Sequence, residues 1–114
     1  MKGLHTPWSD EITLIRMEGE KDAAGYRNPE PVLSDPLLCS FEDGVSQSEF
    51  YLSRKAGYQA SAQAEVWSVD YDGFWPRGYT GRRLCKLRGR TYEIVRAFQN
   101  SMDTKMLILE EVLR

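Results

Sequence analysis

The C-terminal part of the sequence constrains the fold more than any other part. Residues 84–98, LCKLRGRTYEIVRAF, alternate apolar and polar side chains on both sides of Gly89-Arg90. Alternation interrupted by two turn-forming residues predicts a β-hairpin, and glycine in the first turn position favours a type II′ turn. This turn sets Leu87 opposite Tyr92, whereas a turn one residue earlier sorts the two faces less well. The chain must therefore contain antiparallel sheet.

A second turn, QNSMD, leads from this hairpin into another strand-like segment, so the end of the chain is predicted to form a meander. The final strand is apolar on both sides over Met106–Leu109, which is typical of a strand inside a closed or covered sheet. Loops are expected over Lys21–Pro31 and Phe74–Arg83. Besides the hairpin, the sequence predicts four strands: Glu11–Glu20, Pro36–Glu42, Gln63–Tyr71 and Thr104–Leu113.

One short helix, Gln47–Ala56, is predicted between these strands. Ser46 followed by Glu49 matches a capping box, in which each side chain bonds the backbone N–H of the other residue. Gly57 is the expected stop. Such a short helix is marginal alone in water. We therefore expect it to dock on the sheet through its aromatic residues, Phe50 with Tyr51 or Tyr58.

These elements define the fold class as mainly β. We expect a small antiparallel β-barrel of about six strands with one short α-helix between the second and third strands, closing one end of the barrel. In Gln63–Tyr71, the face that carries Trp67 and Tyr71 is expected to be buried. With 114 residues, the chain suits one domain. We assign residues 1–10 to a flexible N-terminal arm and residues 11–114 to the barrel.

The sequence contains no pattern that predicts an enzyme. It has neither a P-loop nor an HExxH motif. Its one histidine, His5, lies in the predicted arm and leaves Cys39 and Cys85 without a partner base. The two cysteines lie in apolar segments and are expected to be reduced and buried. We predict no catalytic residues, no cofactor and no metal. Without a long apolar run or a signal-like N-terminus, we expect no membrane contact and synthesis in the cytoplasm.

Charge is unevenly distributed along the chain. Residues 1–53 hold four Lys/Arg and ten Asp/Glu, whereas residues 54–114 hold eleven Lys/Arg and seven Asp/Glu. A basic second half fits a solvated hairpin, contact with nucleic acid, or contact with an acidic surface of a neighbouring subunit. The loops Lys21–Asp35 and Asp72–Arg83 are candidate contact segments. The candidate residues for contact with a partner or DNA are Trp75, Arg77, Tyr79, Arg82, Arg83, Arg54 and Lys55.

The order and spacing of several segments resemble a known family, the head closure proteins of tailed phages, also called head–tail joining, adaptor or stopper proteins. No single motif is specific, and the likeness covers most of Glu11–Val112. The Asp72–Arg83 loop departs from the family in being long, aromatic and basic. The segments that carry the resemblance are Ile12–Arg16, Gln47–Tyr51, Ala56–Tyr58, Ala64–Trp67, Gly89–Arg96 and Met106–Glu111.

The resemblance implies a small β-barrel with one helix and no enzymatic activity or cofactor. It implies a virion protein of a tailed phage or prophage that forms a ring of six copies at the head–tail interface, after assembly in the host cytoplasm. The implied partners are the portal and its adaptor ring, the tail proteins, further copies of this chain and packaged DNA. Two alternatives stay open: a small nucleic-acid-binding β-barrel, which would stack bases on its aromatic residues, and a tail completion or terminator protein.

Overall fold

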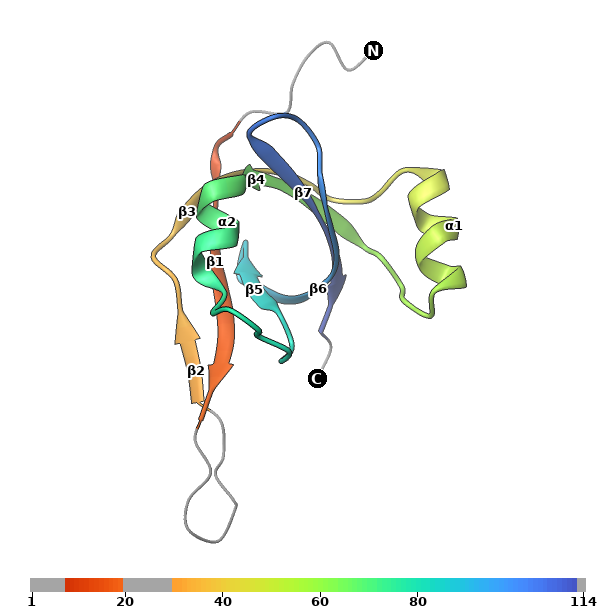
Figure 1. Ribbon diagram of the computed structural model, residues 1–114. Coiled ribbons are helices and arrows are strands. Elements are labelled where there is room, and N and C mark those ends of the chain that lie inside the picture. Colours follow the sequence, from red (N-terminus) through yellow and green to blue (C-terminus); the bar gives the residue numbers. More distant parts are fainter. Residues whose placement is uncertain (1–7, 20–29, 113–114) are drawn as a thin grey trace, which may run out of the picture.

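The computed structural model describes residues 8–19 and 30–112. Within them, six antiparallel strands close into a barrel and a seventh strand, β2, extends one side of it (Figure 1). The barrel order is β1-β3-β4-β7-β6-β5, and β5 pairs again with β1. The mainly β barrel is thereby confirmed, with a second helix that the sequence did not predict. The elements are β1 Asp10–Glu18, β2 Glu30–Leu33, β3 Leu37–Glu42, α1 Gln47–Lys55, β4 Ala62–Trp67, α2 Ser68–Phe74, β5 Leu84–Leu87, β6 Arg90–Gln99 and β7 Thr104–Glu111.

Strand β1 joins the barrel to its extension. Its first residues pair with β3 and its last residues with β2, while its other edge pairs with β5. Between β2 and β3, Ser34 continues the ladder: its N–H donates to the Leu14 carbonyl and its Oγ accepts from the Leu14 N–H, both at 2.9 Å. Pro36 has no N–H to donate, which explains the break. Strand β2 starts at Glu30, so the predicted loop Lys21–Pro31 ends earlier than expected; its residues up to 29 lie outside the described part.

Small side chains on β4 fill the barrel interior. Ala62, Ala64 and Val66 are almost fully buried in the core cluster, whereas Trp67 is 42% exposed. The prediction that the aromatic face of this strand is buried is therefore wrong. The interior of a narrow barrel has room for small residues on some strands because large ones arrive from others. Here the large core side chains include those of Leu14, Leu107 and Leu109.

The strand predicted over Gln63–Tyr71 ends at Trp67, and the chain turns into α2. In a continued strand, Tyr71 would point outward with Trp67, since alternate residues share a face. The helical turn instead brings Tyr71 into the core, where it is 2% exposed. The Ser68 N–H donates to the Asp103 carbonyl at 2.8 Å and fixes the start of the turn. The predicted burial of Tyr71 is thus confirmed, but Tyr71 is buried because it lies in a helix and not because it continues the strand.

The β5–β6 hairpin turns at Arg88-Gly89, so the predicted turn at Gly89-Arg90 is wrong. Cys85 pairs with Tyr92, and both side chains lie in the core. Arg88 and Gly89 have φ angles of 52° and 75°, as in a type I′ turn, whose twist matches that of the strands. The unusual φ of Arg88 is compensated because its guanidinium donates two hydrogen bonds to Asp10, of 2.8 and 2.9 Å.

Helix α1 begins and ends close to where the sequence predicts. The Glu49 N–H donates to Ser46 Oγ at 3.1 Å, which is half of the expected capping box. Gly57, at φ 92°, and Tyr58 donate back to the carbonyls of Arg54 and Ser53 in a Schellman motif. The Glu49 side chain does not complete the box, because it pairs with Arg96 on β6.

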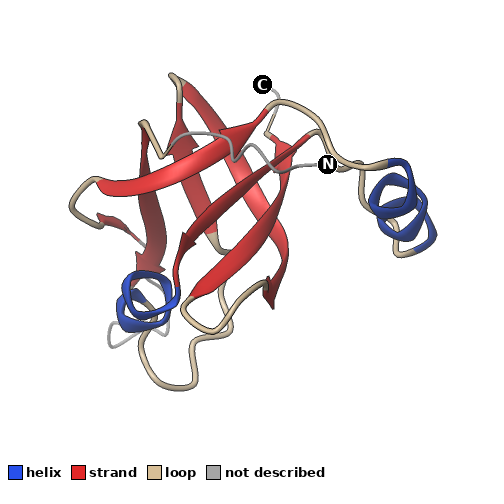
Figure 2. Ribbon diagram, turned by 90° about the horizontal axis from the view of Figure 1, so that it is seen from above, coloured by secondary structure: helices blue, strands red, loops and turns tan. Residues whose placement is uncertain are grey.

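The predicted docking of α1 is wrong. Its aromatic residues are exposed, by 36% at Phe50 and 60% at Tyr51, while Glu49 and Ser53 are buried. The helix projects from the side of the barrel, and α2 lies on the opposite side in both views (Figures 1 and 2). Helix α2 follows directly from the end of β4 and contributes Tyr71 to the core, so α2, rather than α1, packs on the barrel.

The remaining strand predictions are confirmed to within a few residues at their ends. Cys39 and Cys85 are free thiols with no exposed surface, as expected. The predicted N-terminal arm, residues 1–10, lies mostly outside the described residues, and β1 already includes Asp10.

Candidate partner-contact surfaces

The seven candidate contact residues fall into two groups that the fold keeps apart. Arg54 and Lys55 occupy the last turn of α1. The other five belong to the segment 75–83, which connects α2 to β5. Because α1 and α2 lie on opposite sides of the barrel, the two groups cannot form one site (Figures 1 and 2). They are the candidates Trp75, Arg77, Tyr79, Arg82 and Arg83.

Trp75 packs on the inner side of the segment 75–83. It is 9% exposed, and its ring lies 5.5 Å from Tyr79 in a stacked arrangement and 4.9 Å from Phe74 in an edge arrangement. The Arg83 guanidinium covers the Trp75 ring at 4.9 Å. Because the indole is almost fully buried by these neighbours, Trp75 leaves little ring surface for a base to stack on. Its buried Nε1–H has no acceptor among the described residues.

Tyr79 anchors the same segment to β1. Its hydroxyl accepts from the Met17 N–H at 3.0 Å and donates to the Arg82 carbonyl at 2.7 Å. Gly81 makes this geometry possible, since a Cβ there would lie 2.7 Å from the Tyr79 hydroxyl oxygen. Arg82 is exposed and pairs with Glu93 at 3.0 Å, and Arg77 is also exposed. The outward-facing cations of this segment are therefore Arg77 and Arg82, while Arg83 has a packing role.

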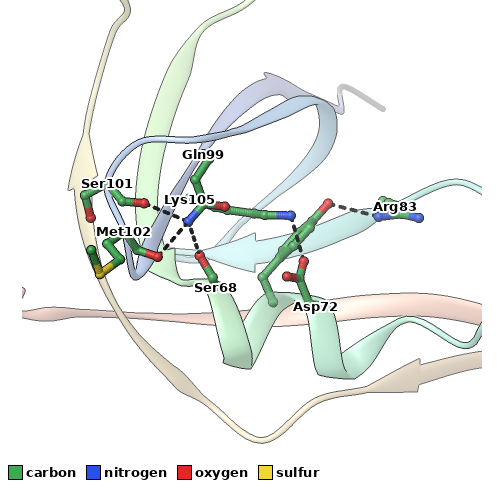
Figure 3. Close-up of polar contacts among 8 residues, drawn as sticks. Ser68, Asp72, Arg83, Gln99, Ser101, Met102 and Lys105 are labelled. Atoms are coloured by element: carbon green, nitrogen blue, oxygen red, sulfur yellow. Dashed lines mark hydrogen bonds and ion pairs between the residues drawn. The ribbon is translucent and has the colours of Figure 1, made fainter.

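Polar contacts hold α2 against the turn between β6 and β7 (Figure 3). The Gln99 amide donates to Ser68 Oγ at 3.0 Å and to the Ser101 carbonyl at 2.7 Å. Lys105 pairs with Asp72 at 2.8 Å. Arg83, at the end of the segment 75–83, donates to the Tyr71 hydroxyl at 3.3 Å. This network fixes the segment 75–83 at both of its ends.

Helix α1 presents a different surface, which we call the helix patch: Phe50, Tyr51, Leu52, Arg54 and Lys55. All five residues are exposed, and the Arg54 guanidinium lies over the Phe50 ring at 5.7 Å. The opposite side of α1 is held by the ion pair between Glu49 and Arg96. The helix patch is thus an apolar and basic surface with a fixed orientation. The basic part of the helix patch was predicted from the sequence, but its aromatic residues were predicted to be buried.

A second aromatic surface, which we call the tryptophan groove, was not predicted from the sequence. The rings of Trp8 and Trp67 lie 4.9 Å apart at a groove of about 590 Å³, which Leu38 and the acidic residues Glu65 and Asp103 also line. Cys39 and Val66 form an inward-facing pair; Leu38 comes one residue before Cys39 and Trp67 one residue after Val66, so both point out of the barrel. Pairing of the two strands in this register was the signal that could have revealed the groove.

Part of the charge asymmetry is used within the fold. Arg88 pairs with Asp10, and Arg96 pairs with Glu49, so two arginines of the basic half neutralise carboxylates of the acidic half. Hydrogen bonds from Arg88 hold the pKa of Asp10 below its usual value. By contrast, Arg54 and Lys55 have no carboxylate partner in the described part of the chain. The cations left for a partner are therefore fewer than the sequence suggests.

Metal ligation, membrane spanning and thiol reactivity can each be assessed for the described residues. They contain no cluster of three metal-ligating side chains, and none of their helices is long and apolar enough to cross a membrane. Burial raises the pKa of the Cys39 thiol to about 12 and raises that of Cys85 as well, so neither is a ready nucleophile. No protein-family model and no curated protein matches this chain.

Proposed function

We propose that this chain is a subunit of the head–tail connector of a tailed phage or prophage, a head closure protein that retains packaged DNA below the portal and provides a surface for the tail. Several copies form a ring. The observation that carries the proposal is the helix patch, a set of exposed apolar and basic side chains on a helix that is fixed from behind by Glu49 and Arg96. Exposed apolar side chains that gather on one projecting element are characteristic of protein contact.

The closed barrel supports the same function. The six barrel strands pair with a neighbour on each side, whereas β2 pairs only with β1 in the described part of the chain, so the elements outside the barrel are the ones left for assembly. This chain has two such projections, α1 and the extension of β1 with β2, which leave the barrel on different sides (Figure 1). The Cα atoms span 57 × 29 × 26 Å, so one subunit can contact neighbours well beyond its barrel. The order and spacing of the segments that resemble head closure proteins agree with this role.

The segment 75–83 is the candidate for contact with DNA or the adaptor. Arg77 and Arg82 face outward and are free of packing roles in the core. Replacing both with glutamate is expected to reduce DNA retention in the head. Arg83 is unsuited to this test, because it covers Trp75 and its loss would disturb the fold. Normal DNA retention in the Arg77→Glu, Arg82→Glu variant would remove this role from the segment.

The experiment that tests the function is electron microscopy of lysates from the phage or prophage without this gene. A head closure role predicts separate tails beside heads that have lost their DNA, and complementation by the intact gene should restore whole virions. Filled heads beside unattached tails would favour a tail completion protein. Normal virions would contradict an assembly role. Salt-dependent binding of single-stranded DNA by the purified protein would then favour the nucleic-acid-binding barrel.

A further inference from the structure

The helix patch and the tryptophan groove lie at opposite ends of one hairpin. Helix α1 is inserted in the connection between β3 and β4, whereas Leu38 is the second residue of β3 and Trp67 is the last residue of β4. Six residues of strand separate the two ends by about 20 Å. The two surfaces of one chain therefore cannot meet each other, and each is left with exposed aromatic side chains.

The two surfaces have matching chemistry. The helix patch combines Phe50, Tyr51 and Leu52 with the cations of Arg54 and Lys55. The groove combines indole rings and Leu38 with the carboxylates of Glu65 and Asp103. Glu65 already accepts hydrogen bonds from Thr104 at 2.7 Å and Asn100 at 3.0 Å, which hold its carboxylate in place without neutralising it. Within the described residues, no ion pair uses Glu65 or Asp103.

Sizes match as well. Helix α1 has nine residues and is about 13 Å long, so two turns of it present the whole helix patch. The groove, at about 590 Å³, is large enough for two or three aromatic or aliphatic side chains but too shallow to enclose a folded domain. Trp67 is 42% exposed and Leu38 is 49% exposed, so both still have apolar surface to bury.

We propose that α1 of one copy of this chain packs into the tryptophan groove of the next copy. Tyr51, opposite the buried face of α1, enters between Trp67 and Leu38, and Lys55, one turn later, reaches Asp103. The contact joins two different surfaces, so an open chain of copies has a free helix patch at one end and a free groove at the other, and a closed ring has neither. Closure into a ring rests on the proposed function. The interface itself identifies the two surfaces that would join neighbouring subunits.

Disulfide trapping tests the interface on the purified protein. One variant carries Ser48→Cys, beside Tyr51 on the exposed side of α1, and a second carries Ser101→Cys at the groove. The two are mixed at about 1 mM, where contacts with millimolar dissociation constants are populated, and mildly oxidised. The matched control pairs Ser48→Cys with Lys86→Cys, an exposed position on β5 away from both surfaces.

The proposal predicts a disulfide between Ser48→Cys and Ser101→Cys that forms at least about tenfold faster than the disulfide of the control pair. Lys55→Glu should slow the trapping, and Asp103→Lys in the other variant should restore it. Trapping no faster than in the control overturns the interface. Preferential trapping of Ser48→Cys with itself also overturns it, since the two helices would then meet each other around a twofold axis.

The test separates the interface from the proposed function. Failure of trapping, together with separated heads and tails in lysates without the gene, would remove the interface and leave the connector role. Efficient trapping with normal virions in those lysates would establish the interface and remove the connector role.

Discussion

The position of α1 should depend on one ion pair. Glu49 is 8% exposed and its Oε1 pairs with Arg96, while its Oε2 has no hydrogen-bond partner among the described residues. Replacing Arg96 with methionine keeps most of the aliphatic stem and removes the charge. The substitution leaves the Glu49 carboxylate, on the side of α1 that faces the barrel, without a cation.

The expected cost is about 2 kcal/mol. Truncating one partner of a charged, buried hydrogen bond costs about 1–3 kcal/mol, and full burial of both ions would cost more. Here the side chain of Arg96 is 43% exposed and that of Glu49 is 10% exposed, which favours the middle of this range. A nine-residue helix is marginal alone, so the chain avoids the unpaired charge by releasing α1 into water. The barrel should lose little stability.

Native-state hydrogen exchange distinguishes release of α1 from a loss of stability of the whole barrel. In Arg96→Met, the Phe50 and Ala56 amides, which both donate within α1, should exchange about 30-fold faster. The Leu107 amide, in the centre of β7, should be unaffected. Adding Glu49→Gln should restore much of the protection, with a coupling of about 1.5 kcal/mol between the two substitutions. Unchanged exchange in α1, or additive effects, would refute the argument that this pair holds the helix.

An exposed ion pair provides the control for the double-mutant cycle of Arg96→Met and Glu49→Gln. Arg82 and Glu93 are 59% and 34% exposed and lie 3.0 Å apart. Their coupling should be no more than about 0.5 kcal/mol, as is usual for surface pairs. An equal coupling in the two cycles would mean that burial of Glu49 has no part in the effect.

Three further predictions concern the turn, the thiols and the segment 75–83. Because Arg88 lowers the pKa of Asp10, the stabilisation is present above the unfolded-state pKa of about 3.9 and is lost as pH falls through the lower folded-state value. Urea titrations should therefore find Asp10→Asn less stable than the wild type at pH 7 and equally stable in strong acid; a constant difference would contradict this. Cys39, with a pKa of about 12, should react with iodoacetamide at pH 8 only as fast as the barrel opens, and rapid labelling of native protein would contradict its burial. Gly81→Ala should cost about 1 kcal/mol through the lost phenol hydrogen bonds, whereas Gly73→Ala in α2 should be neutral or stabilising; equal effects would contradict the steric argument.

Local signals in the sequence predict the parts of the fold that depend on nearby residues. The meander follows from alternation, and the limits of α1 follow from Ser46 and Gly57, whose bonds reach only a few residues along the chain. The β5–β6 turn does not follow in this way, because Arg88 adopts a positive φ in the presence of Asp10, 78 residues earlier. Alternation also overextended β4, since only the packed barrel decides whether Tyr71 turns inward.

In the candidate sites too, local sequence predicts some features, whereas others depend on residues that are distant in the sequence. Charge runs in the sequence predicted Arg77 and Arg82 as exposed cations, which the structure agrees with. Trp75 was predicted from its residue type as a contact residue and lies in the core, because Arg83 and Tyr79 cover it. The tryptophan groove escaped prediction because its residues come from four separate segments that only strand pairing brings together.

The most direct test of the connector role is to locate the chain in assembled particles. An epitope fused after Arg114 and labelled with an antibody fragment can be seen by cryo-electron microscopy of virions from the phage or prophage that carries the gene. A connector role predicts a ring of label at the junction between head and tail. Label elsewhere on the particle, or intact particles without label, would contradict it.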